Sequence, residues 1–98
     1  MAFDIKGSGP DLTVVFSGDL TFSENVKFRQ LLKDLAERDF QNCTFDMSGV
    51  KMIDSAGLGM LLIAREQADT SRWKLSVTGA DGHVLNMLKL TKLVDLLS

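Results

Sequence analysis

One short segment of this 98-residue sequence combines a carboxylate, a hydroxyl and two glycines at the start of a predicted helix. The segment spans residues 54–59, and a strongly apolar run follows it. Ser55 is well placed as the N-cap, because its hydroxyl can accept a hydrogen bond from the backbone N–H of Gly57 or Leu58. The start of a helix offers unpaired N–H groups and the positive end of the helix dipole, so it would tolerate a phosphate on Ser55.

Reversible phosphorylation is the chemistry that this segment favours. A phosphate on Ser55 would add about −1.5 to −2 charges at neutral pH, next to the carboxylate of Asp54. Because Gly57 and Gly59 carry no side chain, we expect a kinase active site to approach the backbone closely. The structural alternative is an ordinary N-cap with glycines for a tight turn, and the spacing by itself favours that alternative.

The predicted helix after the glycines is apolar on nearly all sides over its first two turns. We expect Leu58, Leu61 and Leu62 to face a sheet. Met60 and Ile63 then lie about 140–200° away from Leu58 around the helix, at 100° per residue. They are interpreted either as residues covered by neighbouring segments or as an exposed apolar dock for a partner.

Strand and helix patterns alternate along the rest of the chain. Thr21 and Glu24 have the spacing of a capping box, and residues 93–97 fit either a strand or a helical turn. A Gly/Pro-rich turn at 7–11 joins the first two strands into a hairpin. The sequence predicts strands at about 3–6, 12–17, 43–47 and 73–77, and helices at about 23–38, 58–70 and 84–88. This order favours a single α/β domain, residues 1–98, with parallel pairings after the hairpin.

Composition excludes several classes of protein. A net charge of −2 and a pI near 5.2 argue against a nucleic-acid binder. A single cysteine, Cys43, permits no intrachain disulfide and fits a reducing cytoplasm. No apolar run reaches the roughly 20 residues of a membrane span, and the first residues lack the apolar core of a signal peptide. No cluster of Cys, His and carboxylate residues has metal-ligand spacing, and no cofactor is expected. The lone His83 is interpreted as a surface or capping residue. The chain is therefore not expected to be an enzyme.

The sequence around Ser55 resembles the signature of the STAS domain family, which includes sulphate-transporter tails and anti-sigma factor antagonists. That signature reads Asp-Leu-Ser-x-Val-x-x-Ile-Asp-Ser-Ser/Thr/Ala-Gly-Leu-Gly, and residues 46–59 follow it. Residues 14–20 are similar to the family's second strand and turn, and residues 84–93 to its third helix. The resemblance implies a STAS-like mixed β-sheet with an opening hairpin and with helices packed mainly on one face.

For the antagonist type, the resemblance implies a phosphorylatable switch of bacterial signalling and transcription regulation. Unphosphorylated members bind a serine kinase or anti-sigma factor of the histidine-kinase-like ATPase fold, phosphorylation of the position matching Ser55 releases it, and a serine phosphatase resets the switch. The family's two aspartates match Asp46 and Asp54. The expected partner-binding residues are Asp54, Ser55, Ala56, Gly57, Leu58, Gly59, Met60 and Ile63.

Two other functions stay open at this stage. STAS-like domains also serve as constitutive subunits of ABC-type transporter assemblies, where they dock on an ATP-binding protein without phosphorylation. The loop at residues 54–59 could instead bind a nucleotide or another small ligand.

Overall fold

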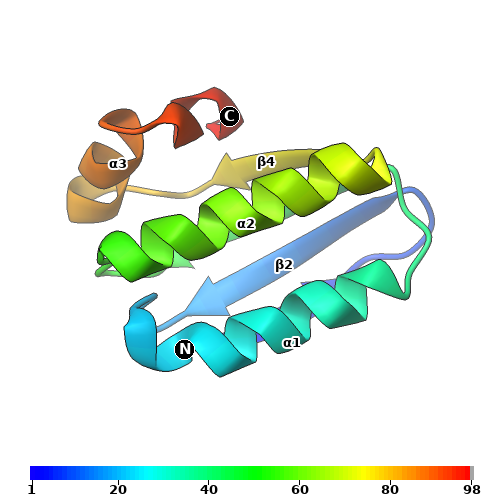
Figure 1. The fold of residues 1–98 in the computed structure, drawn as a ribbon, viewed down its shortest axis with the longest axis horizontal. Coiled ribbons are helices and arrows are strands. Elements are labelled where there is room, and N and C mark those ends of the chain that lie inside the picture. The colour runs from blue at the N-terminus through cyan, green and yellow to red at the C-terminus, as the bar shows by residue number, and fades with distance from the viewer. Residues whose placement is uncertain (98) are drawn as a thin grey trace.

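A computed structural model describes residues 1–97 and shows the predicted alternation of strands and helices (Figure 1). In chain order the elements are β1 (Ala2–Lys6), β2 (Asp11–Ser17), the 3₁₀ helix η1 (Phe22–Glu24), α1 (Asn25–Ala36), β3 (Asn42–Gly49), α2 (Ser55–Ser71), β4 (Lys74–Thr78), α3 (Gly82–Lys89) and the 3₁₀ helix η2 (Lys92–Leu96). None of the helices within residues 1–97 is long and apolar enough to cross a membrane.

The four strands form one mixed sheet in the order β1-β2-β3-β4. β1 and β2 pair antiparallel as the predicted hairpin, whereas β2, β3 and β4 run parallel. The carboxyl ends of the three parallel strands therefore share one edge, and η1, α2 and α3 all begin there. A parallel bridge between Leu20 and Ile53 holds two of these connections side by side.

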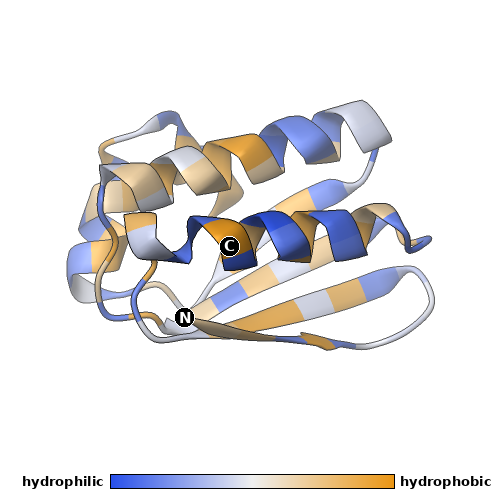
Figure 2. Cartoon of the chain, turned by 60° about the horizontal axis from the view of Figure 1, so that its bottom comes forward, coloured by the Kyte–Doolittle hydropathy of each residue, from blue (hydrophilic) through white to orange (hydrophobic). Residues whose placement is uncertain are grey.

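The hydrophobic core lies between one face of the sheet and helices α1 and α2, which cover that face (Figure 1). Alternate strand residues such as Val14, Phe16 and Phe45 are fully buried, because successive side chains of a strand point to opposite faces. Phe16 and Phe45 pack edge to face with ring centroids 5.0 Å apart. Figure 2 shows hydrophobic and hydrophilic residues alternating along the strands and along the helices. The expectation of helices mainly on one face is confirmed.

The start of the first helix differs from the prediction. Thr21 and Glu24 do not form a capping box, because neither side chain caps η1 or α1. Glu24 instead accepts a hydrogen bond from the N-terminal ammonium of Met1 at 2.7 Å, and this bond lowers the pKa of its carboxyl. The 3₁₀ turn takes up residues 22–24, so α1 covers Asn25–Ala36 rather than residues 23–38.

The C-terminal segment combines the two forms that the sequence left open. Residues 92–96 form η2, and Leu97 then makes an isolated parallel bridge to Val77 of β4. Arg65 of α2 holds η2 in place, since its guanidinium donates to the carbonyl of Lys92 at 2.6 Å and to Asp95 Oδ2 at 3.3 Å.

Candidate functional site

Asp54, and not Ser55, is the N-cap of α2, so the predicted cap is wrong by one residue. Asp54 has an extended backbone, and its Oδ1 accepts a hydrogen bond from the N–H of Gly57 at 2.7 Å. Its Oδ2 accepts a second bond from the N–H of Phe22 at 3.1 Å. α2 therefore begins at Ser55, three residues before the predicted start at Leu58. A carboxylate serves better here because its two oxygens satisfy two backbone donors at once.

Ser55 is left as the first residue of the helix with an exposed side chain. Among residues 1–97, no group forms a hydrogen bond with its hydroxyl, and no group accepts one from the backbone N–H of Ser55 or Ala56. A phosphate on this hydroxyl would lie at the positive end of the α2 dipole, close to these free N–H groups. The expected phosphate site is thus sterically open, and within residues 1–97 the Ser55 hydroxyl forms no hydrogen bond that would stabilise the fold.

The two glycines of the segment have different roles. Gly57 is buried, and a Cβ there would lie 2.2 Å from the carbonyl oxygen of Leu20, so only glycine lets α2 start this close to the Leu20 turn. A Cβ on Gly59 would meet no atom within 4 Å. The expectation that both glycines leave the helix start accessible to a kinase is therefore wrong for Gly57, because Gly57 is buried.

The expected exposure of Met60 and Ile63 is confirmed for Ile63 only. Ile63 is 51% exposed, but Met60 is only 5% exposed and belongs to the core. Gln67 lies seven residues after Met60, on the same side of the helix, and donates a hydrogen bond to the carbonyl of Leu32 in α1 at 2.8 Å. This side of α2 faces α1, which covers Met60.

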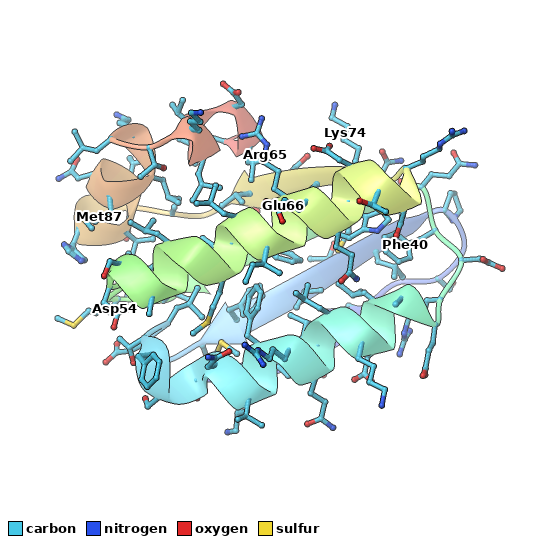
Figure 3. All side chains as sticks on the ribbon, in the orientation of Figure 1. Phe40, Asp54, Arg65, Glu66, Lys74 and Met87 are labelled. Atoms are coloured by element: carbon cyan, nitrogen blue, oxygen red, sulfur yellow. The ribbon has the colours of Figure 1, made fainter. Side chains whose placement is uncertain are left out.

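Leu58 is buried as expected, while Leu62 is 40% exposed rather than turned toward the sheet. Leu62 follows Ser55 by seven residues, so both lie on the outer face of α2. Glu66, one turn further, lies on the same open side in Figure 3, where Asp54 marks the beginning of the helix. The outer face of α2 thus runs from the candidate phosphate site onto exposed apolar side chains.

Two exposed apolar residues that the sequence analysis did not select border the site. Phe22 is 70% exposed and is tied to Asp54 through its N–H, and Met52 is 52% exposed two residues before Asp54. We call Phe22, Met52, Leu62 and Ile63 the apolar rim of the site. Phe22 and Met52 escaped detection because they lie in connections without a helical or strand period, although the parallel order of the strands does bring these connections to one edge.

The only histidine also reaches this edge. His83 Nε2 lies 3.0 Å from the carbonyl oxygen of Ile53, in the connection that leads to Asp54 at the start of α2. The contact links the first turn of α3 to the approach of α2. His83 is exposed, as expected for a surface histidine, and its contact with Ile53 follows only from the folded topology.

Asp46 lies on β3, and within residues 1–97 its side chain forms no hydrogen bond with Ser55. Its Oδ1 accepts a hydrogen bond from the N–H of Ser48 at 3.0 Å, and this bond lowers the pKa of the Asp46 carboxyl. A Cβ on Gly79 would come within 2.9 Å of the same oxygen. Asp46 therefore orders the backbone near the end of β3 through Ser48.

Hollows of the surface occur around Phe40, at the opposite end of the domain from Asp54 (Figure 3). One of about 490 Å³ is lined in part by Pro10 and Phe40, and one of about 220 Å³ by residues that include Phe40 and Trp73. Phe40 packs on Trp73 with ring centroids 5.0 Å apart. No group of three or more His, Cys, Asp or Glu side chains within residues 1–97 is arranged to hold a metal ion.

The profile of a protein family described as "Mlab, STAS domain" matches residues 1–98. The chain belongs to the STAS domain family. No curated protein matches the sequence at a significant level.

Solved structures share the STAS fold at low sequence identity. The anti-sigma factor antagonist SpoIIAA in its unphosphorylated form superposes with a TM-score of 0.83 at 11% identity, over 99% of this chain and 86% of that one. The phosphorylated form of the Bacillus cell fate determinant SpoIIAA gives 0.69 at 12% identity, with coverage of 99% and 89%.

Transporter proteins contain the same fold. A sulfate transporter family protein from Wolinella succinogenes has a TM-score of 0.73 at 17% identity, over 89% of this chain and 69% of that one. The murine anion transporter Solute Carrier 26 family member A9 has 0.78 at 19% identity, and the match covers 92% of this STAS domain but 15% of the transporter.

Proposed function

We propose that this STAS domain is a phosphorylatable protein-interaction switch, with Ser55 as the acceptor. The observation that carries the proposal is that two neighbouring residues have separate roles. Asp54 caps α2, and the Ser55 hydroxyl is exposed and unbonded within residues 1–97. The structural resemblance to SpoIIAA, which has been solved in both unphosphorylated and phosphorylated forms, supports the proposal of a phosphorylatable switch.

Phosphorylation requires only an accessible hydroxyl on this chain. We therefore propose that the chain is a substrate of enzymes and not an enzyme. A partner serine kinase transfers the γ-phosphoryl group of ATP to Ser55 Oγ, and ADP and the hydroxyl proton leave. A serine phosphatase hydrolyses the ester with one water, which restores the hydroxyl and releases inorganic phosphate. Because the kinase reaction consumes ATP, we place the switch in the cytoplasm.

Phosphorylation would act on binding through desolvation and charge. A partner that covers the apolar rim must also cover the start of α2, where Ser55 lies beside the carboxylate of Asp54. A phosphate there carries about −1.5 to −2 charges and must be stripped of water or paired with a cation. A partner without such a cation is therefore released, which is the behaviour of an anti-sigma factor or kinase that binds only the unphosphorylated domain.

The test begins with the protein isolated from its own cells and mapped by mass spectrometry. We expect one phosphoryl group on the peptide that contains Ser55, and none in the Ser55→Ala variant. Binding to the cognate kinase is then titrated for wild type, Ser55→Ala and Ser55→Asp. Ser55→Asp should bind at least about tenfold more weakly, or about 1.4 kcal/mol, while Ser55→Ala binds like wild type. Phosphate confined to other residues would contradict the proposal.

A second candidate function is a constitutive STAS subunit of an ABC-type transporter assembly. The structural likeness to the sulfate transporter family protein and to the anion transporter favours it. In that case the partner is an ATP-binding transport subunit, and Ser55→Asp and wild type bind it equally well. The same titration therefore separates the two functions.

A further inference from the structure

The two edges of the sheet differ in whether another segment of the chain pairs with the edge strand. At the β4 edge, Leu97 bridges to Val77 and covers part of the strand. At the β1 edge, the strand pairs with β2 on one side, and no other segment within residues 1–97 pairs with it. Figure 2 shows this strand, which starts beside the N label, as the outermost one of the sheet with no helix beyond it. An open edge presents unpaired backbone N–H and C=O groups, which is a template for another strand.

β1 is short and carries the charged residues Asp4 and Lys6, but it lacks two other features that block an open edge. It contains no proline, and its register with β2 continues without a bulge from Ala2 to Lys6. Its inward-facing residues, Phe3 and Ile5, are only partly buried although they pack against the core. A neighbouring strand would cover more of their apolar surface.

The charges of β1 are complementary to a second copy of the same strand. Asp4 and Lys6 are exposed on the face opposite to Phe3 and Ile5. In an antiparallel pair with a two-fold axis at Ile5, each Ile5 faces the other, and Asp4 of one copy lies directly opposite Lys6 of the second. Opposite charges in such cross-strand positions stabilise a pair, and equal charges destabilise it. This pairing places two Asp4–Lys6 pairs across the dimer axis.

We propose that β1 mediates a symmetric homodimer in which two copies pair antiparallel about Ile5 and their sheets become continuous. The occupant of the open edge is thus a second copy of this chain. The interface is isologous, as expected for a two-fold dimer. Ser55 belongs to α2 and lies outside β1, so the dimer does not depend on the proposed phosphorylation.

The competing register has its axis at Asp4. It brings Phe3 opposite Ile5, which is favourable for the apolar face, but it also places the two Asp4 carboxylates directly opposite each other. This register makes a different prediction for a change of charge. Replacing Asp4 by lysine would leave one like-charge pair in place of another, whereas in the proposed register it converts two attractive pairs into two repulsive ones.

Sedimentation equilibrium on the full chain tests the proposal by a charge swap. The wild type should dimerise with a dissociation constant below about 1 mM. Asp4→Lys and Lys6→Asp should each weaken dimerisation by about tenfold or more, because both cross-strand pairs become repulsive. An equimolar mixture of the two variants should recover a heterodimer of near wild-type affinity. Asp69→Lys on α2 is the control for the charge change and should dimerise like wild type.

Several outcomes would overturn the dimer. The wild type could stay monomeric at about 1 mM, or both single variants could dimerise as well as wild type, which would place the contact elsewhere. A mixture that fails to recover would exclude the register about Ile5. Circular dichroism of each variant confirms that the monomer is folded, and all these changes are at exposed positions.

Discussion

The carboxylate of Asp54 joins α2 to Phe22, a residue 32 positions earlier in the chain, through a 3.1 Å hydrogen bond from the Phe22 backbone N–H. The same side chain caps α2 through Gly57. Asp54 therefore fixes both the start of the helix and the position of one member of the apolar rim. This double role leaves Ser55 free.

Replacing Asp54 should cost stability, whereas replacing Ser55 should not. We expect Asp54→Ala to lower the free energy of unfolding by about 1–2 kcal/mol, because two backbone donors lose their acceptor. Ser55→Ala should stay within about 0.5 kcal/mol of wild type, as for an exposed residue without partners. Urea unfolding followed by circular dichroism measures both. A larger loss for Ser55→Ala than for Asp54→Ala would show that the serine is the cap.

The two glycines of the site provide a matched pair of variants. Gly57→Ala places a methyl group against the Leu20 carbonyl and should destabilise the fold by about 2 kcal/mol or more, since backbone cannot move aside cheaply. Gly59→Ala meets open space in a helix and should stabilise it by about 0.5–1 kcal/mol. Thermal unfolding of the two variants gives shifts of opposite sign. Equal shifts would mean that Gly57 is not in tight contact with the Leu20 turn.

Met60 and Ile63 should respond in opposite ways to a lysine. Met60→Lys introduces a charge into the core and should reduce stability by about 3 kcal/mol or more. Ile63→Lys should leave the fold intact and weaken partner binding, because Ile63 belongs to the exposed apolar rim. Unfolding curves and the titration with the cognate partner separate the two effects. Normal binding by folded Ile63→Lys would remove Ile63 from the docking surface.

Cys43 should be chemically silent in the folded protein. Burial raises the pKa of its thiol to about 12, so at pH 8 only about one molecule in ten thousand carries the reactive thiolate. Modification by a thiol reagent should be at least about a hundredfold slower in buffer than in denaturing urea. The rate should rise with pH in both states. Rapid labelling of the native protein at pH 8 would show that β3 is accessible to solvent.

Much of the fold follows from local patterns in the sequence. Alternating apolar residues place the strands, since one face of each strand is buried and the other is not. Helical spacing places α1 and α3 to within a few residues, and the segment at 54–59 marks the site. These features depend on neighbours along the chain, so a sequence contains them directly.

Other features were decided only by tertiary structure. Asp54 and Ser55 are both good N-cap residues, and Asp54 becomes the cap because Phe22 arrives from η1 as a second donor. Met60 is buried because α1 packs along that side of α2, although its position on a helical wheel resembles that of an exposed residue. The contact of His83 with Ile53 likewise needs β3 and β4 to lie parallel, with their carboxyl ends at one edge. In each case the deciding partner is distant in sequence, and only the packing of the folded chain brings it into range.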